Sequence, residues 1–209
     1  MKIEVKNEVI SGRILNLSSL KPEEINVWDI IWPLSLSNRY NGHTPFPFDV
    51  LSHSLMVYEF YCKYEKEPKL KESIAMLLHD AAESYIGDIV HPLKIAPEFN
   101  FFHELEEQIM EVILKAFGVE YSEIDWKKVY LYDKTVTDVE FRTFFPFLTN
   151  TFKPEGMFEV KPEDKKLIKA DVVGVYNLLE VLTFTTIKDE EARKRLFELP
   201  DTLKNYVEI

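Results

Sequence analysis

The stretch Met76–Lys94, MLLHDAAESYIGDIVHPLK, places an ionisable pair inside an otherwise apolar helical pattern. His79 and Asp80 are adjacent in this run, and Glu83 follows about one helical turn further along. A carboxylate buried beside an imidazole without a counter-charge costs on the order of several kcal/mol, so a cation should compensate it. The stretch therefore predicts a core helix that carries part of a metal site.

Two further candidate ligands lie on other predicted helices. Over residues 49–66, apolar side chains recur at helical spacing and place His53 on the inward face. A helix over about residues 122–146 carries Asp133 and Glu140 on a mostly apolar face. Together with the His–Asp pair, these side chains could converge on one point.

This set of side chains suits a divalent cation. On one helix, His79 and Asp80 project about 100° apart and can both lean toward one point beside the axis. Two imidazoles and two carboxylates would neutralise the ion and leave coordination positions open for water and phosphate. Glu83 overhangs the same point without having to ligate, and a carboxylate there could move a proton. We expect one divalent metal ion: Mn, Co, Fe, Ni, Zn or Mg.

The rest of the chain is predominantly helical in its pattern. Residues 2–17 alternate in polarity around a Ser11-Gly12 turn, which predicts a short β-hairpin. Asp49 is a natural helix N-cap, and Gly118 is a C′ residue that ends a helix. We expect one all-α domain over residues 1–209, with a bundle core at about 20–150 and a C-terminal helical extension at 151–209. Further predicted elements are a helical turn at 22–24, a loop at 38–47, helices at 69–85, 101–117, 162–181 and 189–196, and an edge strand at 157–160.

Composition restricts the classes of function. With 6 glycines in 209 residues, a loop-rich β architecture and a Gly-rich phosphate cradle are both disfavoured. The net charge of −11 argues against binding of duplex nucleic acid through phosphate contacts. No run of about 18 apolar residues is present, so we expect a soluble, cytoplasmic protein with no membrane partner.

Other groups are expected to have structural roles. The single Cys62 cannot form an intrachain disulfide, and its place on an amphipathic helix predicts a buried, inert thiol. The acid-rich run Glu104–Glu107 is expected to form a solvated helix face. Aromatic side chains in the C-terminal helices suggest a homodimer.

The order of these candidate ligands resembles a known family. His53, then His79-Asp80, then Asp133 is similar to the H…HD…D pattern of the HD-domain phosphohydrolase superfamily, an all-helical fold that binds divalent metal. Residues 79–94, HDAAESYIGDIVHPLK, resemble the HD-x-x-E-x-x-x-G-D-x-x-x-P-x-K signature of the bacterial 5′-deoxynucleotidases. The segments SNRYNGHT and LSHS, at 37–44 and 51–54, resemble phage and prokaryotic relatives.

The resemblance implies roles for the matched residues around the metal. It implies that Glu83 acts as acid or base on the hydrolytic water, with Asp80 beside it in catalysis. The implied metal ligands are His53, His79, Asp80 and Asp133.

The resemblance also implies a substrate-binding set. Arg39 matches an arginine that holds phosphate, and its guanidinium suits bidentate phosphate recognition. Lys94 would add a second cation, and Asp88 matches an aspartate that reads the 3′ side of the sugar. His43 is expected to orient the loop around Arg39 or to lie near the site. Tyr40 stands where the deoxynucleotidases have Trp, a departure that bears on base or sugar preference.

The fourth ligand has alternatives. Asp133, followed seven positions later by Glu140, resembles the phage-type segment and is favoured. Asp171, in LIKADVVGVYNLLE, resembles the corresponding helix of the bacterial deoxynucleotidases. Asp138 is a weaker competitor, because it is offset from the inward stripe.

Together, the residues and the resemblance predict a metal-dependent phosphohydrolase that acts on a nucleotide. The expected reaction converts a deoxyribonucleoside 5′-monophosphate into nucleoside and phosphate. Alternatives with the same metal site are a deoxynucleoside triphosphohydrolase and a cyclic-nucleotide phosphodiesterase. A non-catalytic nucleotide-binding regulatory module is the alternative from another class.

Overall fold

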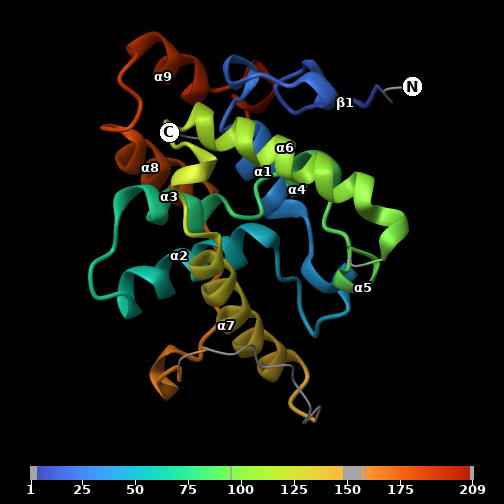
Figure 1. Ribbon diagram of the computed structural model, residues 1–209, viewed down its shortest axis with the longest axis vertical. Helices are drawn as coiled ribbons and strands as arrows, with labels where there is room; N and C mark the ends of the chain where they lie inside the picture. The colour runs from blue at the N-terminus through green and yellow to red at the C-terminus, as the bar shows by residue number, and fades with distance from the viewer. Residues whose placement is uncertain (1–3, 95, 148–156, 158, 208–209) are drawn as a thin grey trace.

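The computed structural model describes residues 4–94, 96–147, 157 and 159–207, without the side chains of residues 91 and 92. The described chain is mostly helical with a small N-terminal hairpin, which confirms the predicted fold class (Figure 1). None of the helices in these ranges is long and apolar enough to cross a bilayer. The strands are β1 (Lys6–Glu8) and β2 (Ile14–Asn16), and the helices are α1 (Trp28–Leu36), α2 (Val50–Tyr64), α3 (Leu70–Leu78), α4 (Glu83–Ile86), α5 (His91–Lys94), α6 (Asn100–Ala116), α7 (Trp126–Phe144), α8 (Val172–Thr183) and α9 (Glu190–Phe197).

The N-terminal hairpin is shorter than predicted but lies within residues 2–17. Its strands are antiparallel, with Asn7 opposite Leu15. Asp29 of α1 is fully buried, and its carboxylate accepts hydrogen bonds from the Ser11 N–H and the Arg13 guanidinium, both at 2.8 Å. An internal carboxylate therefore fastens the hairpin to the helical body.

The helix α2 is the central support of the site. The Asp49 carboxylate caps it by accepting from the Ser52 N–H at 2.7 Å, which confirms the predicted N-cap. His53 and Tyr61 are completely buried on its inward face, where α2 packs against α3 and α7. Cys62 is exposed, so the prediction of a buried thiol is wrong. The reason is that Cys62 lies half a helical rotation away from His53, on the outer face.

The prediction of one continuous helix over residues 69–85 is wrong, because residues 79–82 separate two helices, α3 and α4. Between them the backbone hydrogen bonds run three residues back instead of four. The His79 imidazole donates from Nδ1 to the Met76 carbonyl oxygen at 2.9 Å, and a continuous α-helix would offer that carbonyl to the N–H of Asp80. The His–Asp pair therefore stands in a tight turn at the end of α3.

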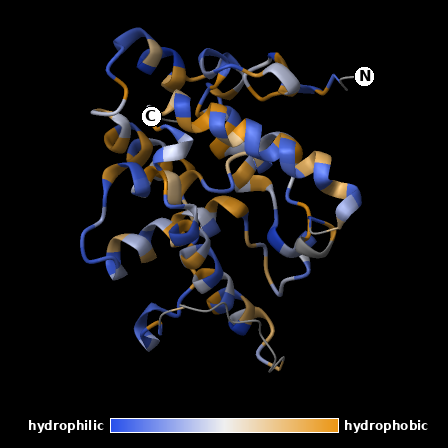
Figure 2. Ribbon diagram, viewed as in Figure 1, coloured by the Kyte–Doolittle hydropathy of each residue, from blue (hydrophilic) through white to orange (hydrophobic). Residues whose placement is uncertain are grey.

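The helix α6 is amphipathic, with hydrophilic and hydrophobic residues alternating along the ribbon (Figure 2). It ends at a glycine, as predicted. Gly118 has a φ of +74°, and its N–H bonds back to the Lys115 carbonyl while the Val119 N–H bonds back to Leu114. This pair of bonds closes the helix in a Schellman motif. A Cβ on Gly118 would lie 2.5 Å from the carbonyl oxygen of Thr186, so the position tolerates no side chain.

Gly118→Ala is expected to reduce the free energy of unfolding by about 1–3 kcal/mol, because it adds both a left-handed non-glycine residue and a backbone clash. Urea denaturation measures the loss. Gly12→Ala is the matched control: its φ is +79°, but the nearest atom to its Cβ is 3.9 Å away. The control should lose less stability, and equal losses in the two variants would contradict the clash.

The helix α7 begins later than predicted. A short 3-10 turn at Tyr121–Glu123 comes first, and α7 starts at Trp126. The cause is Asp125, whose carboxylate accepts from the Lys128 N–H at 3.2 Å and makes it the N-cap instead of a first-turn residue. The helix ends at Phe144, just before the Pro146 break, as expected.

The C-terminal third is less helical than predicted. The helix over 162–181 is wrong: a 3-10 turn covers Pro162–Asp164, and α8 begins only at Val172. The Ala170 N–H donates to Ser52 Oγ at 3.0 Å, which fastens this chain segment to α2 instead of to a helical carbonyl. The edge strand is also absent at residues 157, 159 and 160, because the hairpin lies at the other end of the molecule and offers no edge there (Figure 1). Residues 151–156 and 158 lie outside the described residues.

The C-terminal helices share the core of the bundle. The helix α9 is capped by Asp189, close to the predicted 189–196. One cluster of buried hydrophobic side chains runs from Leu15 to Val207 and includes Leu179 of α8 and Phe197 of α9. Within the described residues, the C-terminal segment therefore packs as part of the same core as α2 and α3.

Candidate metal centre

Three segments that are distant in the sequence bring the predicted ligands together. His53 Nε2, on α2, lies 3.2 Å from His79 Nε2 and 3.6 Å from Asp80 Oδ2. His79 Nε2 and Asp80 Oδ2 are 3.2 Å apart. Asp133 Oδ1, on α7, lies 3.1 Å from His53 Nε2. His53, His79 and Asp80 form a cluster that could hold a metal ion, and the Asp133 carboxylate is in contact with it.

Hydrogen bonds on the far side of each imidazole determine which nitrogen faces the cluster. His53 Nδ1 lies 2.7 Å from Glu140 Oε1, and His79 Nδ1 lies 2.9 Å from the Met76 carbonyl oxygen. Both partners accept hydrogen bonds, so each Nδ1 is the donor. In the neutral rings, both Nε2 lone pairs are then directed at each other and at the carboxylates. Acceptors that face one another repel, and a cation between them removes that repulsion.

The charges around the cluster determine the protonation of His53 and Asp80 when no metal is bound. Burial and Arg39 lower the pKa of His53, but Glu140 and Asp133 outweigh them and raise it to about 9. Burial alone would raise the pKa of Asp80, yet the two imidazoles hold it well below its ordinary value. Without metal, a proton on His53 therefore supplies the positive charge. A metal ion has to displace that proton, so metal affinity is expected to rise with pH.

Glu140 is fully buried beside His53 and forms hydrogen bonds with three side chains. Its Oε2 accepts from Arg39 Nε at 3.1 Å and from the Tyr40 hydroxyl at 3.0 Å, while Oε1 accepts from His53. Burial alone would raise the pKa of Glu140, but Arg39 and His53 hold it below its ordinary value. A carboxylate behind a ligand imidazole sets the tautomer and orientation of that ring. Glu140 therefore orients His53 and ties it to the loop that carries Arg39.

The loop after Arg39 has an uncommon backbone conformation. Tyr40 and Asn41 have φ values of 55° and 51°, in the left-handed region, which costs on the order of 1–3 kcal/mol per non-glycine residue. The bond from the Tyr40 hydroxyl to Glu140 and the edge-on contact between the rings of Tyr40 and Phe144 oppose that cost. These contacts hold the loop in its strained conformation and thereby fix the position of Arg39.

Arg39 lies at the edge of the cluster. Its Nη1 is 3.5 Å from Asp80 Oδ2, and its Nη2 is 3.4 Å from Thr137 Oγ1. Burial lowers the pKa of Arg39, but Glu140 and Asp80 outweigh it and raise the pKa above its ordinary value. The guanidinium therefore stays charged beside the position where the sequence predicts a phosphate.

Glu83 begins α4 and is almost completely buried. Its Oε1 accepts from Lys94 Nζ at 2.7 Å, and Lys94 Nζ also lies 3.0 Å from Glu106 Oε1. Within the described part of the chain, Glu83 Oε2 is buried and has no hydrogen-bond partner. Burial raises the pKa of Glu83 to about 8, with Asp80 acting in the same direction and Lys94 against it. A carboxyl group that titrates near neutral pH is suited to proton transfer.

The two remaining predicted substrate residues differ in position. Asp88 is half-buried, and burial raises its pKa while Arg39 lowers it, so it lies within electrostatic range of the cluster. His43 is exposed at the end of the 3-10 turn Arg39–Gly42, where its backbone N–H donates to the Tyr40 carbonyl oxygen at 2.9 Å. The structure thus leaves His43 at the surface.

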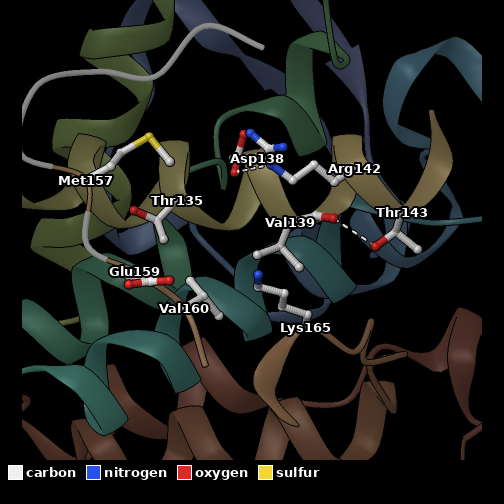
Figure 3. A pocket seen from close by; sticks show the side chains of 9 residues that line it. All are labelled: Thr135, Asp138, Val139, Arg142, Thr143, Met157, Glu159, Val160 and Lys165. Carbon is white, nitrogen blue, oxygen red and sulfur yellow. Dashed lines mark hydrogen bonds and ion pairs between the residues drawn. The ribbon is translucent and has the colours of Figure 1, made fainter. Parts of the chain in front are cut away.

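The alternative fourth ligands lie elsewhere. Asp171 is exposed and caps α8 by accepting from the Gly174 N–H at 3.0 Å. Asp138 lies on the face of α7 opposite Asp133 and accepts from Arg142 Nε at 2.7 Å. It borders a separate cavity of about 540 Å³, shown in Figure 3. Of the three candidates, the structure brings Asp133 to the cluster.

The residues that line the cavity beside Asp138 are Thr135, Asp138, Val139, Arg142, Thr143, Met157, Glu159, Val160 and Lys165.

Asp133→Ala is expected to weaken metal binding by at least about 100-fold, because losing a ligand should cost at least as much as losing a residue that only supports one. Asp171→Ala is the matched control: it should bind metal like the wild type and lose about 1 kcal/mol of stability with its N-cap. Calorimetric titration with Mn²⁺ and urea denaturation measure the two effects. The reverse pattern of metal affinities would identify Asp171 as the ligand.

Two supporting residues, Thr137 and Glu106, are not predicted from the sequence. Thr137 Oγ1 donates to Asp133 Oδ1 at 3.1 Å, and its position one turn after Asp133 was the available signal. Glu106 was expected on a solvated face, which is wrong for this residue: it is half-buried and pairs with Lys94. The cause is the packing of α5 on α6, and no local pattern indicates that contact.

Comparisons with known proteins identify relatives without an assigned activity. No family model matches the chain. The uncharacterized protein RCAP_rcc00048 of Rhodobacter capsulatus is 32% identical over 113 residues, which are 53% of this chain and 57% of that protein. The uncharacterized protein YfdR of Escherichia coli is 26% identical over 113 residues, 54% of this chain and 58% of that protein. The similarity thus spans little more than half the length of these curated relatives.

Proposed function

We propose that this protein is a metal-dependent phosphohydrolase of the HD-domain type, which hydrolyses a deoxyribonucleoside 5′-monophosphate to nucleoside and phosphate. One observation carries the proposal: His53, His79 and Asp80 form a cluster that could hold a metal ion, and Asp133 Oδ1 lies 3.1 Å from His53 Nε2 at its edge. Imidazole nitrogens and carboxylate oxygens gathered at one point suit a divalent cation. The resemblance of residues 79–94 to the deoxynucleotidase signature supports the substrate class.

The residues that would hold the ion are His53, His79 and Asp80, with the Asp133 carboxylate as the fourth ligand. Nitrogen and carboxylate donors accept Mn, Co, Fe, Ni, Zn or Mg, with affinities that follow the metal and its availability. When bound, the ion supplies a Lewis acid for a phosphoryl oxygen and lowers the pKa of water. Glu140 would hold the His53 ring in the orientation that binding requires.

The other residues of the site would position the substrate and transfer protons. In the proposed reaction, a water oxygen forms a bond to phosphorus while the bond from phosphorus to the 5′-oxygen breaks. Glu83 would accept a proton from the water and return it to the leaving 5′-oxygen, so that the sugar leaves as a neutral alcohol. The charged Arg39 would stabilise the negative charge on the phosphoryl oxygens.

The test is phosphate release by the purified protein loaded with Mn²⁺ or Co²⁺, measured across nucleoside mono-, tri- and cyclic phosphates. Orthophosphate from deoxyribonucleoside monophosphates supports the proposal. Triphosphate from a nucleoside triphosphate, or ring opening of a cyclic nucleotide, would redirect it to another reaction at the same site. Tight nucleotide binding by the metal-loaded protein without turnover would contradict the enzymatic function and favour a regulatory module.

A further inference from the structure

A chain of three charged side chains connects Glu83 to α6. Lys94 Nζ lies between Glu83 Oε1, at 2.7 Å, and Glu106 Oε1, at 3.0 Å. Lys94 and Glu106 have side chains only 17% and 21% exposed, so their pairing is better shielded from water than a surface ion pair. The ammonium group is thus shared between a residue of the site and a residue outside it.

Lys94 and Glu106 lie on helices of very different length. Lys94 belongs to α5, a helix of 4 residues, whereas Glu106 lies on the 17-residue α6, which is anchored by buried side chains such as Ile109. The same face of α6 also contacts the turn before Glu83, since the Ala82 N–H points at Met110 Sδ at 3.3 Å. The long helix therefore contacts both Lys94 and the residue that precedes Glu83.

The two oxygens of Glu83 are treated differently. Oε1 is paired with Lys94, while Oε2 is buried without a hydrogen-bond partner among the described residues. A buried acceptor left unpaired costs about 1–3 kcal/mol, and a purely structural ion pair would have no need to keep one. If Lys94 left to bind a phosphate, Glu83 and Glu106 would both lose their cation. Lys94 is thus better placed to hold Glu83 than to reach the substrate.

We propose that Glu106 is a positioning residue: through Lys94 it holds one oxygen of Glu83 and leaves the other available to the hydrolytic water. The inference rests on the proposed phosphohydrolase function and adds a residue to it. His103 Nδ1 lies 3.7 Å from the second oxygen of Glu106 but is half exposed, so it is a weak competitor for that carboxylate.

The kinetic test uses metal-loaded protein and separates kcat from KM. Glu106→Gln should lower kcat for phosphate release about tenfold, with KM within about twofold of wild type, because a misplaced proton-transfer group affects the transition state. Glu106→Asp should recover part of the loss. Glu104→Gln removes the same charge from an exposed position on α6 and should match the wild type.

A double-mutant cycle tests whether Glu106 acts through Lys94. The double variant Glu106→Gln, Lys94→Met should be no slower than Lys94→Met alone, because both changes break the same chain. Two losses that multiply would overturn the inference. So would a Glu106→Gln variant that raises KM and keeps kcat, because Lys94 would then serve substrate binding.

A measurement without turnover separates failure of this inference from failure of the proposed function. Acetylation of Lys94, followed by mass spectrometry, should be about tenfold faster in Glu106→Gln than in wild type and unchanged in Glu104→Gln, because the ammonium group loses one of its two carboxylates. Equal labelling rates would overturn the inference, even in an active enzyme. A wild type that protects Lys94 but releases no phosphate would contradict the proposed function instead.

Discussion

Under the proposed function, Asp80→Ala is expected to lower phosphate release by about 10³-fold and to abolish metal binding. The Asp80 carboxylate lies 3.2 Å from His79 Nε2 and 3.6 Å from His53 Nε2, so its removal takes away a carboxylate that is close to both imidazoles. Metal content by elemental analysis and phosphate release on the same sample measure the two effects.

Asp80→Asn is the matched control for folding, because it keeps the volume of the side chain and removes its charge. Both variants should show the helical circular dichroism of the wild type. The asparagine variant should still lose most of its metal, because a neutral amide is a weaker ligand for a divalent cation. Full activity in Asp80→Ala, or wild-type metal content in both variants, would refute the assignment of the site.

Glu83→Gln is expected to lower kcat by about 10²-fold while the protein keeps its metal ion. The reason is that glutamine fills the same space but cannot accept the proton from water. Glu83 is not one of the three residues of the cluster that could hold an ion, and its Oε1 pairs with Lys94, so metal content should not change. Glu104→Gln, at an exposed position, is the control and should be as active as the wild type.

The same Glu83→Gln variant should be more stable than the wild type at high pH. Burial raises the pKa of Glu83 from 4.5 to about 8, so the folded state binds more protons than the unfolded state between these values. The wild type therefore loses stability as pH rises through this window, whereas the variant has no such titration. In metal-free protein, the gain in Tm over wild type should be larger at about pH 9 than at about pH 5. A gain that is independent of pH would contradict burial of the charge.

Much of the fold could be predicted because its signals are local. The Asp49 cap, the inward position of His53 on α2 and the glycine that ends α6 each depend on residues within a few positions of one another. The apolar spacing and the scarcity of glycine likewise predict a helical bundle with a small hairpin. Errors occurred where a long-range contact overrode the local pattern, as where Ser52 holds Ala170 out of a helix.

Some residues of the site could be predicted from the sequence, and other features of the site could not. The adjacent His79 and Asp80 and the nearby Glu83 stood out as ionisable residues in an apolar run, so they were visible as a motif. The break between α3 and α4 was not visible, because it depends on a side-chain bond from His79 to the backbone. The choice between Asp133 and Asp171 was open in the sequence for a similar reason: either could cap or ligate, depending on where its helix begins.

By itself, the sequence determined that the chain forms a mainly helical core and that an imidazole and a carboxylate lie next to each other in an apolar stretch of it. Periodicity and capping carry that information, because they act between residues within one or two helical turns. Only the tertiary structure decided which distant side chains complete the cluster, since Glu140 reaches His53 and Glu106 reaches Lys94 through the packing of separate helices. Such contacts depend on how helices cross in space, and no local spacing in the chain encodes them.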